Sequence, residues 1–178
     1  MRILTLFILI VLSALIGGLY GALYDQLTFT ISPEFFTKFR FGRFDLDPDM
    51  DERMAAAVIG FLNTWKAGMV LGGILALASW VNSDSKLMFK YTMQAFGITL
   101  LIAFVTAMIG WSIGPLDQQP NPDAELGIID MNAFKTVINM NNFSYAGGVI
   151  GMFVGIFHQL YSHKRHKVKQ MVINQESL

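Results

Sequence analysis

The sequence contains no cysteine, and only 15% of its 178 residues are charged. The first absence excludes disulfides, thiolate nucleophiles and cysteine-ligated metals. Two of the three histidines, His163 and His166, lie in a basic tail, where a solvated segment near anionic lipid is the ordinary interpretation. The sequence also has no glycine-rich phosphate loop, nucleophile elbow or zinc motif. We therefore expect no metal, no cofactor and no enzymatic activity.

Hydrophobic residues make up 53% of the sequence and are concentrated in long runs. A helix needs roughly 20 residues to cross about 30 Å of hydrocarbon, and four runs reach that length. They lack the alternation of barrel strands, so helices are the structure that satisfies their backbone groups in lipid. The sequence predicts an all-α membrane protein, a four-transmembrane-helix bundle in a single domain over 1–178. The expected spans are 3–23, 55–81, 91–113 and 144–161.

The distribution of Lys and Arg predicts the orientation, because short cytoplasmic segments carry more of them. Seven lie near the termini or between the second and third spans: Arg2, Lys86, Lys90, Lys164, Arg165, Lys167 and Lys169. Five lie on the opposite side: Lys38, Arg40, Arg43, Arg53 and Lys135. We expect both termini in the cytoplasm, with a tail at 162–178, and outer loops at 24–54 and 114–143. The first run is longer than a usual signal core, so we expect it to remain as a helix.

The first outer loop contains the segment YDQLTFTISPEFFTKFRFGRF, residues 24–44. Alternation over Leu27–Ile31 predicts a half-buried strand, and Ser32-Pro33-Glu34 is typical of a helix start. The rings and cations that follow are Phe35, Phe36, Phe39, Phe41 and Phe44, and Lys38, Arg40 and Arg43. We expect them in the outer interface, with rings toward lipid and cations toward headgroups. The alternative is a docking surface for a partner or lipid.

The second outer loop predicts a further short element. Apolar residues recur at helical spacing between 130 and 140, while Asn139, Asn141 and Asn142 are typical of a turn before the fourth span. We expect an interfacial helix there, beside the aromatic segment. Together the two elements would form an extracytoplasmic cap of short interfacial elements.

The stretch DLDPDMDE places carboxylates at every second position, and Asp45, Asp47 and Asp49 match the first three ligands of an EF-hand loop. Met50 replaces the required glycine and Ala56 the bidentate glutamate. We therefore expect an acidic turn that caps the second helix.

Lys66 is the sharpest candidate for a site, since an ionisable residue within a membrane span is costly. Asn63 precedes it on the same helical face, and Asp25, Glu34 or Asp130 could pair with it. Two interpretations remain open. Lys66 forms a structural ion pair or extends to the interface, or it belongs to a permeation or ligand site.

Glycines recur at the spacing typical of helix packing in membranes: Gly17 with Gly21, Gly68 with Gly72, and Gly147, Gly151 and Gly155. They favour packing within one bundle, and the alternative is homo-oligomerisation through the fourth helix.

The run Tyr24-Asp25-Gln26 followed by ISPEFFTKF at 31–39 resembles a segment in a family of small, uncharacterised multi-pass membrane proteins from bacterial genomes. The similarity extends through Arg53, Gly60 and Trp65. The resemblance implies a bacterial inner membrane. It brings no activity and no catalytic residue.

Two functions follow as hypotheses. The first is a non-enzymatic accessory or interaction protein that meets the lipid bilayer, a membrane protein partner or itself, and not nucleic acid. The second is a small-solute or ion transporter or channel that uses Lys66.

Overall fold

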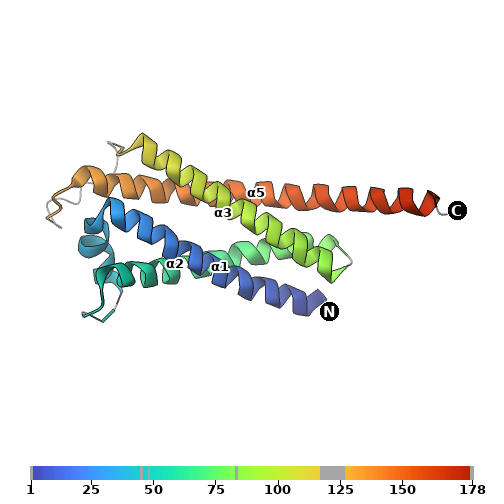
Figure 1. The fold of residues 1–178 in the computed structure, drawn as a ribbon, viewed down its shortest axis with the longest axis horizontal. Coiled ribbons are helices and arrows are strands. Elements are labelled where there is room, and N and C mark those ends of the chain that lie inside the picture. Colours follow the sequence, from blue (N-terminus) through green and yellow to red (C-terminus); the bar gives the residue numbers. More distant parts are fainter. Residues whose placement is uncertain (1, 45, 48, 83, 117–126, 177–178) are drawn as a thin grey trace.

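The computed structural model describes residues 2–44, 46–47, 49–82, 84–116 and 127–176, and these are helical almost throughout. The long helices are α1 (Arg2–Ile31), α2 (Glu52–Ala78), α3 (Ser85–Ile113) and α5 (Met131–Glu176). All four are long and apolar enough to cross a membrane, which confirms the prediction of four helices of that length and agrees with a multi-pass membrane protein. Figure 1 shows that the helices run roughly along one axis and that both termini lie toward the same end.

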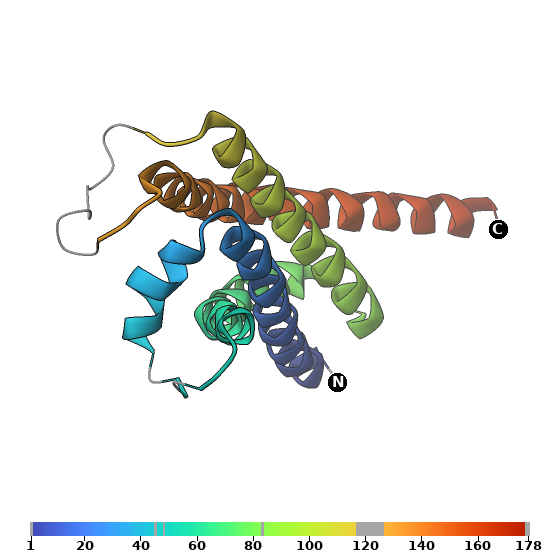
Figure 2. The ribbon, with the colours of Figure 1, turned by 60° about the vertical axis from the view of Figure 1, so that its left-hand side comes forward.

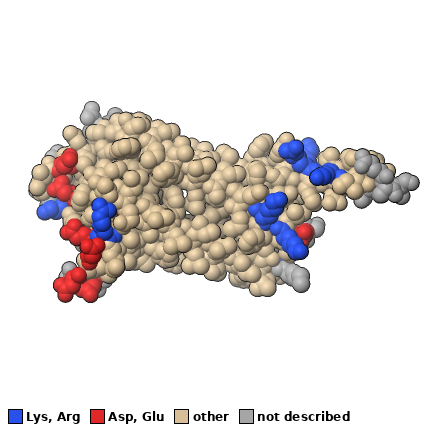
Figure 3. Space-filling view, viewed as in Figure 1, with Lys and Arg blue, Asp and Glu red and all other residues tan. Residues whose placement is uncertain are grey.

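The bundle has two distinct ends. We call the end formed by residues 24–44 and 128–142 the aromatic end, and the opposite end, which holds Arg2 and the connection between α2 and α3, the tail end. On the face shown in Figure 3, charged side chains gather at these two ends, and the belt between them is almost free of charge. This distribution is typical of a protein whose middle faces hydrocarbon.

The helices pair as two antiparallel hairpins, α1 with α2 and α3 with α5. Glycine allows the close approach in the first hairpin, since a Cβ at Gly17 would lie 2.8 Å from the Cα of Gly68. In the second hairpin, a Cβ at Gly151 would lie 2.8 Å from the Cα of Thr99 on α3. Gly147 and Gly155 also face α3, so the glycine ladder of the fourth span packs within the chain. Self-association through that ladder would require surface that α3 already covers.

Short helices complete the aromatic end: η1 (Phe35–Arg40), a π-helical turn, and η2 (Phe41–Arg43), a 3-10 turn. The predicted helix start is confirmed, because the Ser32 hydroxyl accepts a hydrogen bond from the Phe35 N–H at 3.4 Å. At the tail end a 3-10 turn, η3 (Ser79–Val81), follows α2. The predicted cap of α2 is also confirmed, since the Asp51 carboxylate accepts bonds from the N–H groups of Arg53 and Met54. Asp45, which belongs to the same acidic stretch, lies outside the described residues.

The expected strand at Leu27–Ile31 is wrong, because α1 continues through these residues. The polar residues that produced the alternation serve the helix and its neighbour. The Thr28 and Thr30 hydroxyls donate to the carbonyls of Tyr24 and Gln26, and the Gln26 amide donates to the carbonyl of Arg53 at 2.8 Å. These polar side chains therefore form hydrogen bonds within α1 and with α2, and their alternation does not indicate a strand.

The expected turn between an interfacial helix at 130–140 and the fourth span is also wrong, because α5 is continuous over 46 residues. Asn139 is fully buried, and its amide donates to the carbonyl of Gly110 on α3 and to that of Gly114, which caps α3, each at 2.9 Å. It is a helix-packing residue and does not form a turn. The expected tail at 162–178 is likewise helical as far as Glu176.

Candidate functional site

The aromatic end contains a cluster of packed rings. The Phe35 ring centroid lies 5.5 Å from that of Phe36 and 5.4 Å from that of Phe134 on α5. Phe35 is 3% exposed and Phe36 is fully buried, so neither offers a free docking surface. Phe39, Phe41 and Phe44 remain half-buried at the margin. The cluster fastens the segment after α1 onto α5, and edge-to-face ring contacts of this kind add about 0.5–1.5 kcal/mol each to the burial of the rings.

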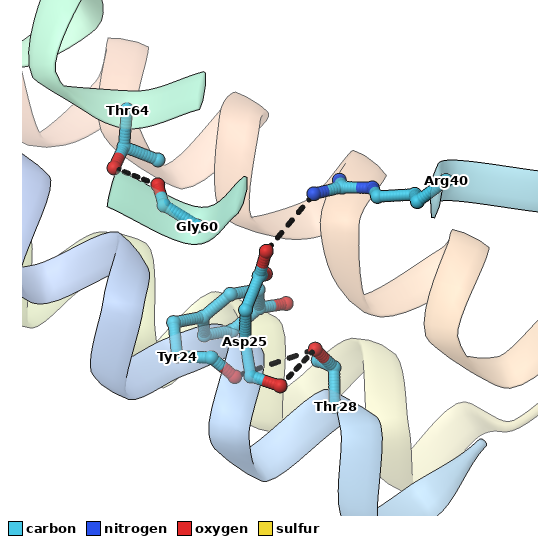
Figure 4. A network of polar contacts seen from close by, with 6 residues as sticks. All are labelled: Tyr24, Asp25, Thr28, Arg40, Gly60 and Thr64. Atoms are coloured by element: carbon cyan, nitrogen blue, oxygen red, sulfur yellow. Dashed lines mark hydrogen bonds and ion pairs between the residues drawn. The ribbon is translucent and has the colours of Figure 1, made fainter. Parts of the chain in front are cut away.

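An ion pair lies beneath the rings. Arg40 donates to the Asp25 carboxylate at 3.0 Å, and the two side chains are only 13% and 5% exposed. Figure 4 shows the carboxylate between α1 and the Arg40 guanidinium, beside Gly60 and Thr64 of α2. Gly60 makes room for this arrangement, since a Cβ there would lie 2.9 Å from the Cβ of Asp25.

The Arg40 guanidinium also lies over aromatic rings, 5.1 Å from the Phe35 centroid and 5.7 Å from that of Phe36. Asp25 was expected as a partner for Lys66, but its partner is Arg40. A buried pair of this kind resists loss of either member, because the remaining charge would be left without compensation.

A cavity of about 480 Å³ opens between the aromatic segment, α2 and α5, and we call it the arginine cavity. The segment contributes Phe35, Phe39, Arg40, Arg43 and Phe44. From α2 comes Asn63, and from α5 come Phe134, Ile138, Asn141, Asn142 and Tyr145. Its walls therefore combine rings, amide groups and two guanidinium groups.

The two arginines of this cavity differ in electrostatic environment. Arg40 is balanced by Asp25, whereas Arg43 is exposed and lies 4.0 Å above the centroid of the Phe39 ring. Among the described residues, no carboxylate forms an ion pair with Arg43. Among the residues that the structure describes, the cavity consequently carries one cation that no carboxylate pairs with.

A second cavity, of about 350 Å³, lies between the two hairpins, and we call it the interhairpin cavity. All four long helices line it, mostly with small or apolar residues such as Gly17, Leu71, Leu100 and Gly148, and its lining includes no charged side chain. Tyr145 lines both the arginine cavity and the interhairpin cavity, so the two cavities share this residue in their walls.

The other residues predicted for the site do not lie together. Asn63 lines the arginine cavity, but Lys66 is exposed on the outside of α2, with its Nζ 5.7 Å from the Trp65 ring centroid. Glu34 accepts hydrogen bonds from the backbone N–H groups of Ile129 and Asp130, at 3.0 and 2.8 Å. Lys38 is exposed.

The contribution of α5 was only partly anticipated. Phe134 and Ile138 were expected beside the aromatic segment, whereas Asn141 and Tyr145 were not assigned to a site. The signal was present, because residues three and four apart lie on one face of a helix and these four follow that spacing. The prediction of a turn at Asn139, Asn141 and Asn142 ended the expected helix near residue 140, so the helical spacing was not followed as far as Tyr145.

A comparison of this chain with protein-family models, with curated proteins and with solved structures finds no match. The resemblance to a family of bacterial membrane proteins therefore stays a prediction. The interpretation of the two cavities rests on their geometry and chemistry.

Proposed function

We propose that the protein is a non-enzymatic membrane protein that binds an anionic amphiphile, with the charged head in the arginine cavity and the apolar chain in the interhairpin cavity. The observation that carries this proposal is that the two cavities share Tyr145 in their walls. A cavity with a cation that pairs with no described carboxylate neighbours one whose lining has no charge. A single ligand with the same division of chemistry would satisfy both.

We assign the main head-binding role to Arg43, which has no ion pair with a described residue and whose guanidinium can donate charge-assisted hydrogen bonds to a carboxylate or phosphate oxygen. The amides of Asn63, Asn141 and Asn142 supply further donors along the same walls. Arg40, held by Asp25, fixes the wall and adds a donor without a second net charge.

The proposed ligand comes from the lipid bilayer. The two hairpins pack tightly within themselves and only loosely against each other, which leaves space for an acyl chain between them. The expected cytoplasmic termini would place the aromatic end at the outer face of a bacterial inner membrane. The head would then lie at the level of the outer headgroups.

This proposal narrows the hypothesis of an accessory protein with a docking surface. The burial of Phe35 and Phe36 favours a concave binding site over a flat aromatic surface. The alternative, a transporter or channel that uses Lys66, has less support, because Lys66 lines neither of the two cavities.

The test measures binding of a fluorescent fatty acid to the purified full-length chain in a non-ionic detergent. Arg43→Gln is compared with Lys38→Gln, which removes one charge from the same segment outside the cavity. We expect Arg43→Gln to weaken binding at least tenfold, since hydrogen bonds to charged groups contribute about 1.5–3 kcal/mol. Lys38→Gln should leave affinity unchanged. Equal effects of the two substitutions, or equal affinity of the wild type for an uncharged analogue, would contradict the proposal.

A further inference from the structure

The tail end contains a separate cavity, of about 760 Å³, in the angle between α3 and α5, and we call it the basic cavity. Four cations line it, Lys90 from α3 and Lys164, Arg165 and Lys169 from α5, and its lining includes no carboxylate. In Figure 3, Lys and Arg side chains gather at this end of the molecule. The concentration of one sign of charge indicates an anionic ligand.

The cavity exists because α5 is much longer than its partner. With 46 residues it extends over about 69 Å, and its final turns run past the end of the bundle (Figures 1 and 2). Its basic residues therefore face the first turns of α3 at the point where α5 separates from the bundle.

The depth of the cavity matches that of a lipid headgroup. Tyr91 and Tyr161 line it, and tyrosine is enriched at membrane interfaces. Along α3, Tyr91 and Trp111 are about 30 Å apart by helical rise, which is the thickness of the hydrocarbon layer. Next to the cavity, Phe157 and Leu160 are 71% and 49% exposed and offer an apolar surface for acyl chains.

A buried polar atom in the same place has no partner. His158 lines the basic cavity, and its Nε2 is buried without a hydrogen-bond partner among the described residues. Buried polar atoms are usually satisfied, so an oxygen from a ligand would complete this one. Gln94 adds a further polar side chain to the lining.

We propose that the basic cavity binds the headgroup phosphate of an anionic phospholipid in the leaflet on the side of the termini. The neighbouring exposed apolar residues favour a lipid over a soluble phosphate, which would make no use of them. Basic pockets beside transmembrane helices are a known type of site for such headgroups. The basic cavity shares no residue with the arginine cavity, so this proposal does not depend on the proposed function.

The experiment measures how strongly the full-length chain retains phosphatidylglycerol relative to phosphatidylcholine in mixed micelles. The test variant is Lys90→Gln with Lys169→Gln. The control is Lys86→Gln with Lys167→Gln, which removes two charges from the same helices outside the cavity. Lys90 and Lys169 would donate charge-assisted hydrogen bonds to the phosphate, so the test variant should lose at least about 25-fold, whereas the control cations attract the lipid only from the surface and their loss should cost much less.

Three results would overturn the proposal. The first is equal loss in both double variants, which would indicate diffuse attraction by the basic tail. The second is efficient displacement of the lipid by millimolar inorganic phosphate, which would indicate a soluble ligand. The third is equal retention of the two lipids by the wild type. Circular dichroism and thermal unfolding of each variant verify that folding is preserved.

Discussion

The ion pair between Arg40 and Asp25 is the interaction at the aromatic end whose loss has the most predictable consequence. It joins α1 to the aromatic segment, and the Asp25 side chain is 5% exposed. Arg40→Gln leaves that carboxylate in a site from which water is largely excluded. Removing one partner of a buried pair typically costs about 3–5 kcal/mol, and we expect a value near the lower limit because water still reaches Arg40, which is 13% exposed.

The partner substitution should be milder. In Asp25→Asn an amide oxygen can still accept a hydrogen bond from Arg40, whose guanidinium lies over the Phe35 and Phe36 rings. We expect a cost of about 1–2 kcal/mol, close to that of a hydrogen bond to a charged group. In the double variant two neutral amides face each other. Its cost should fall below the sum of the single costs by about 2 kcal/mol.

The assay is reversible unfolding of the purified protein by sodium dodecyl sulfate in mixed micelles, followed by far-ultraviolet circular dichroism. Arg43→Gln serves as the matched control, because it removes an arginine from the same segment that has no ion pair with a described residue. Additive single costs would refute the coupling. A cost of Arg40→Gln no greater than that of Arg43→Gln would refute the burial of the pair.

Two further predictions concern the hairpins. Asn139→Ala should destabilise the protein by about 1–2 kcal/mol, because two carbonyls on α3 lose a buried donor, whereas the exposed Asn142 should tolerate alanine in the same unfolding assay. Gly17→Leu should cost about 1–3 kcal/mol by forcing α1 away from Gly68, while Gly97→Leu, where a Cβ meets no atom within 4 Å, should cost nothing measurable.

The membrane spans could be predicted from the sequence because in lipid a long apolar run has few structures open to it. The ends of the helices were harder to predict from the sequence, because the polar residues there have several possible hydrogen-bond partners. Asn139 has high turn propensity, yet its amide bonds to Gly110 and Gly114 across the hairpin. Thr28 and Thr30 gave the period of a strand, yet their hydroxyls bond to their own helix. The partner of Asn139 lies on a neighbouring helix, and those of Thr28 and Thr30 lie one turn back in α1, and the local sequence pattern identifies neither.

The sequence predicted which residues line the candidate site better than it predicted which of them form an ion pair. The rings, arginines and Asn63 were identified from the sequence, but Asp25 was expected as a partner for Lys66. Lys66 was predicted as the partner because an ionisable residue within a membrane span is costly. Arg40 lies outside the spans, beyond the break in the helix at Ser32. The π-helical turn brings Arg40 back over α1, and no periodicity in the sequence predicts the direction in which a chain folds back.

Substitutions at two glycines on α5 distinguish an effect on ligand binding from an effect on folding. Gly148 lines the interhairpin cavity, and a Cβ there would meet no atom within 4 Å, whereas a Cβ at Gly151 would lie 2.8 Å from the Cα of Thr99. Gly148→Leu should therefore fill the space proposed for the acyl chain without straining the hairpin, and leucine is the better helix former by about 0.8 kcal/mol. We expect it to unfold no earlier than the wild type and yet to bind the fluorescent fatty acid at least tenfold more weakly. Gly151→Leu should unfold early. Full binding by a stable Gly148→Leu variant would show that no acyl chain occupies this cavity, and the ligand would then have to bind through the arginine cavity alone.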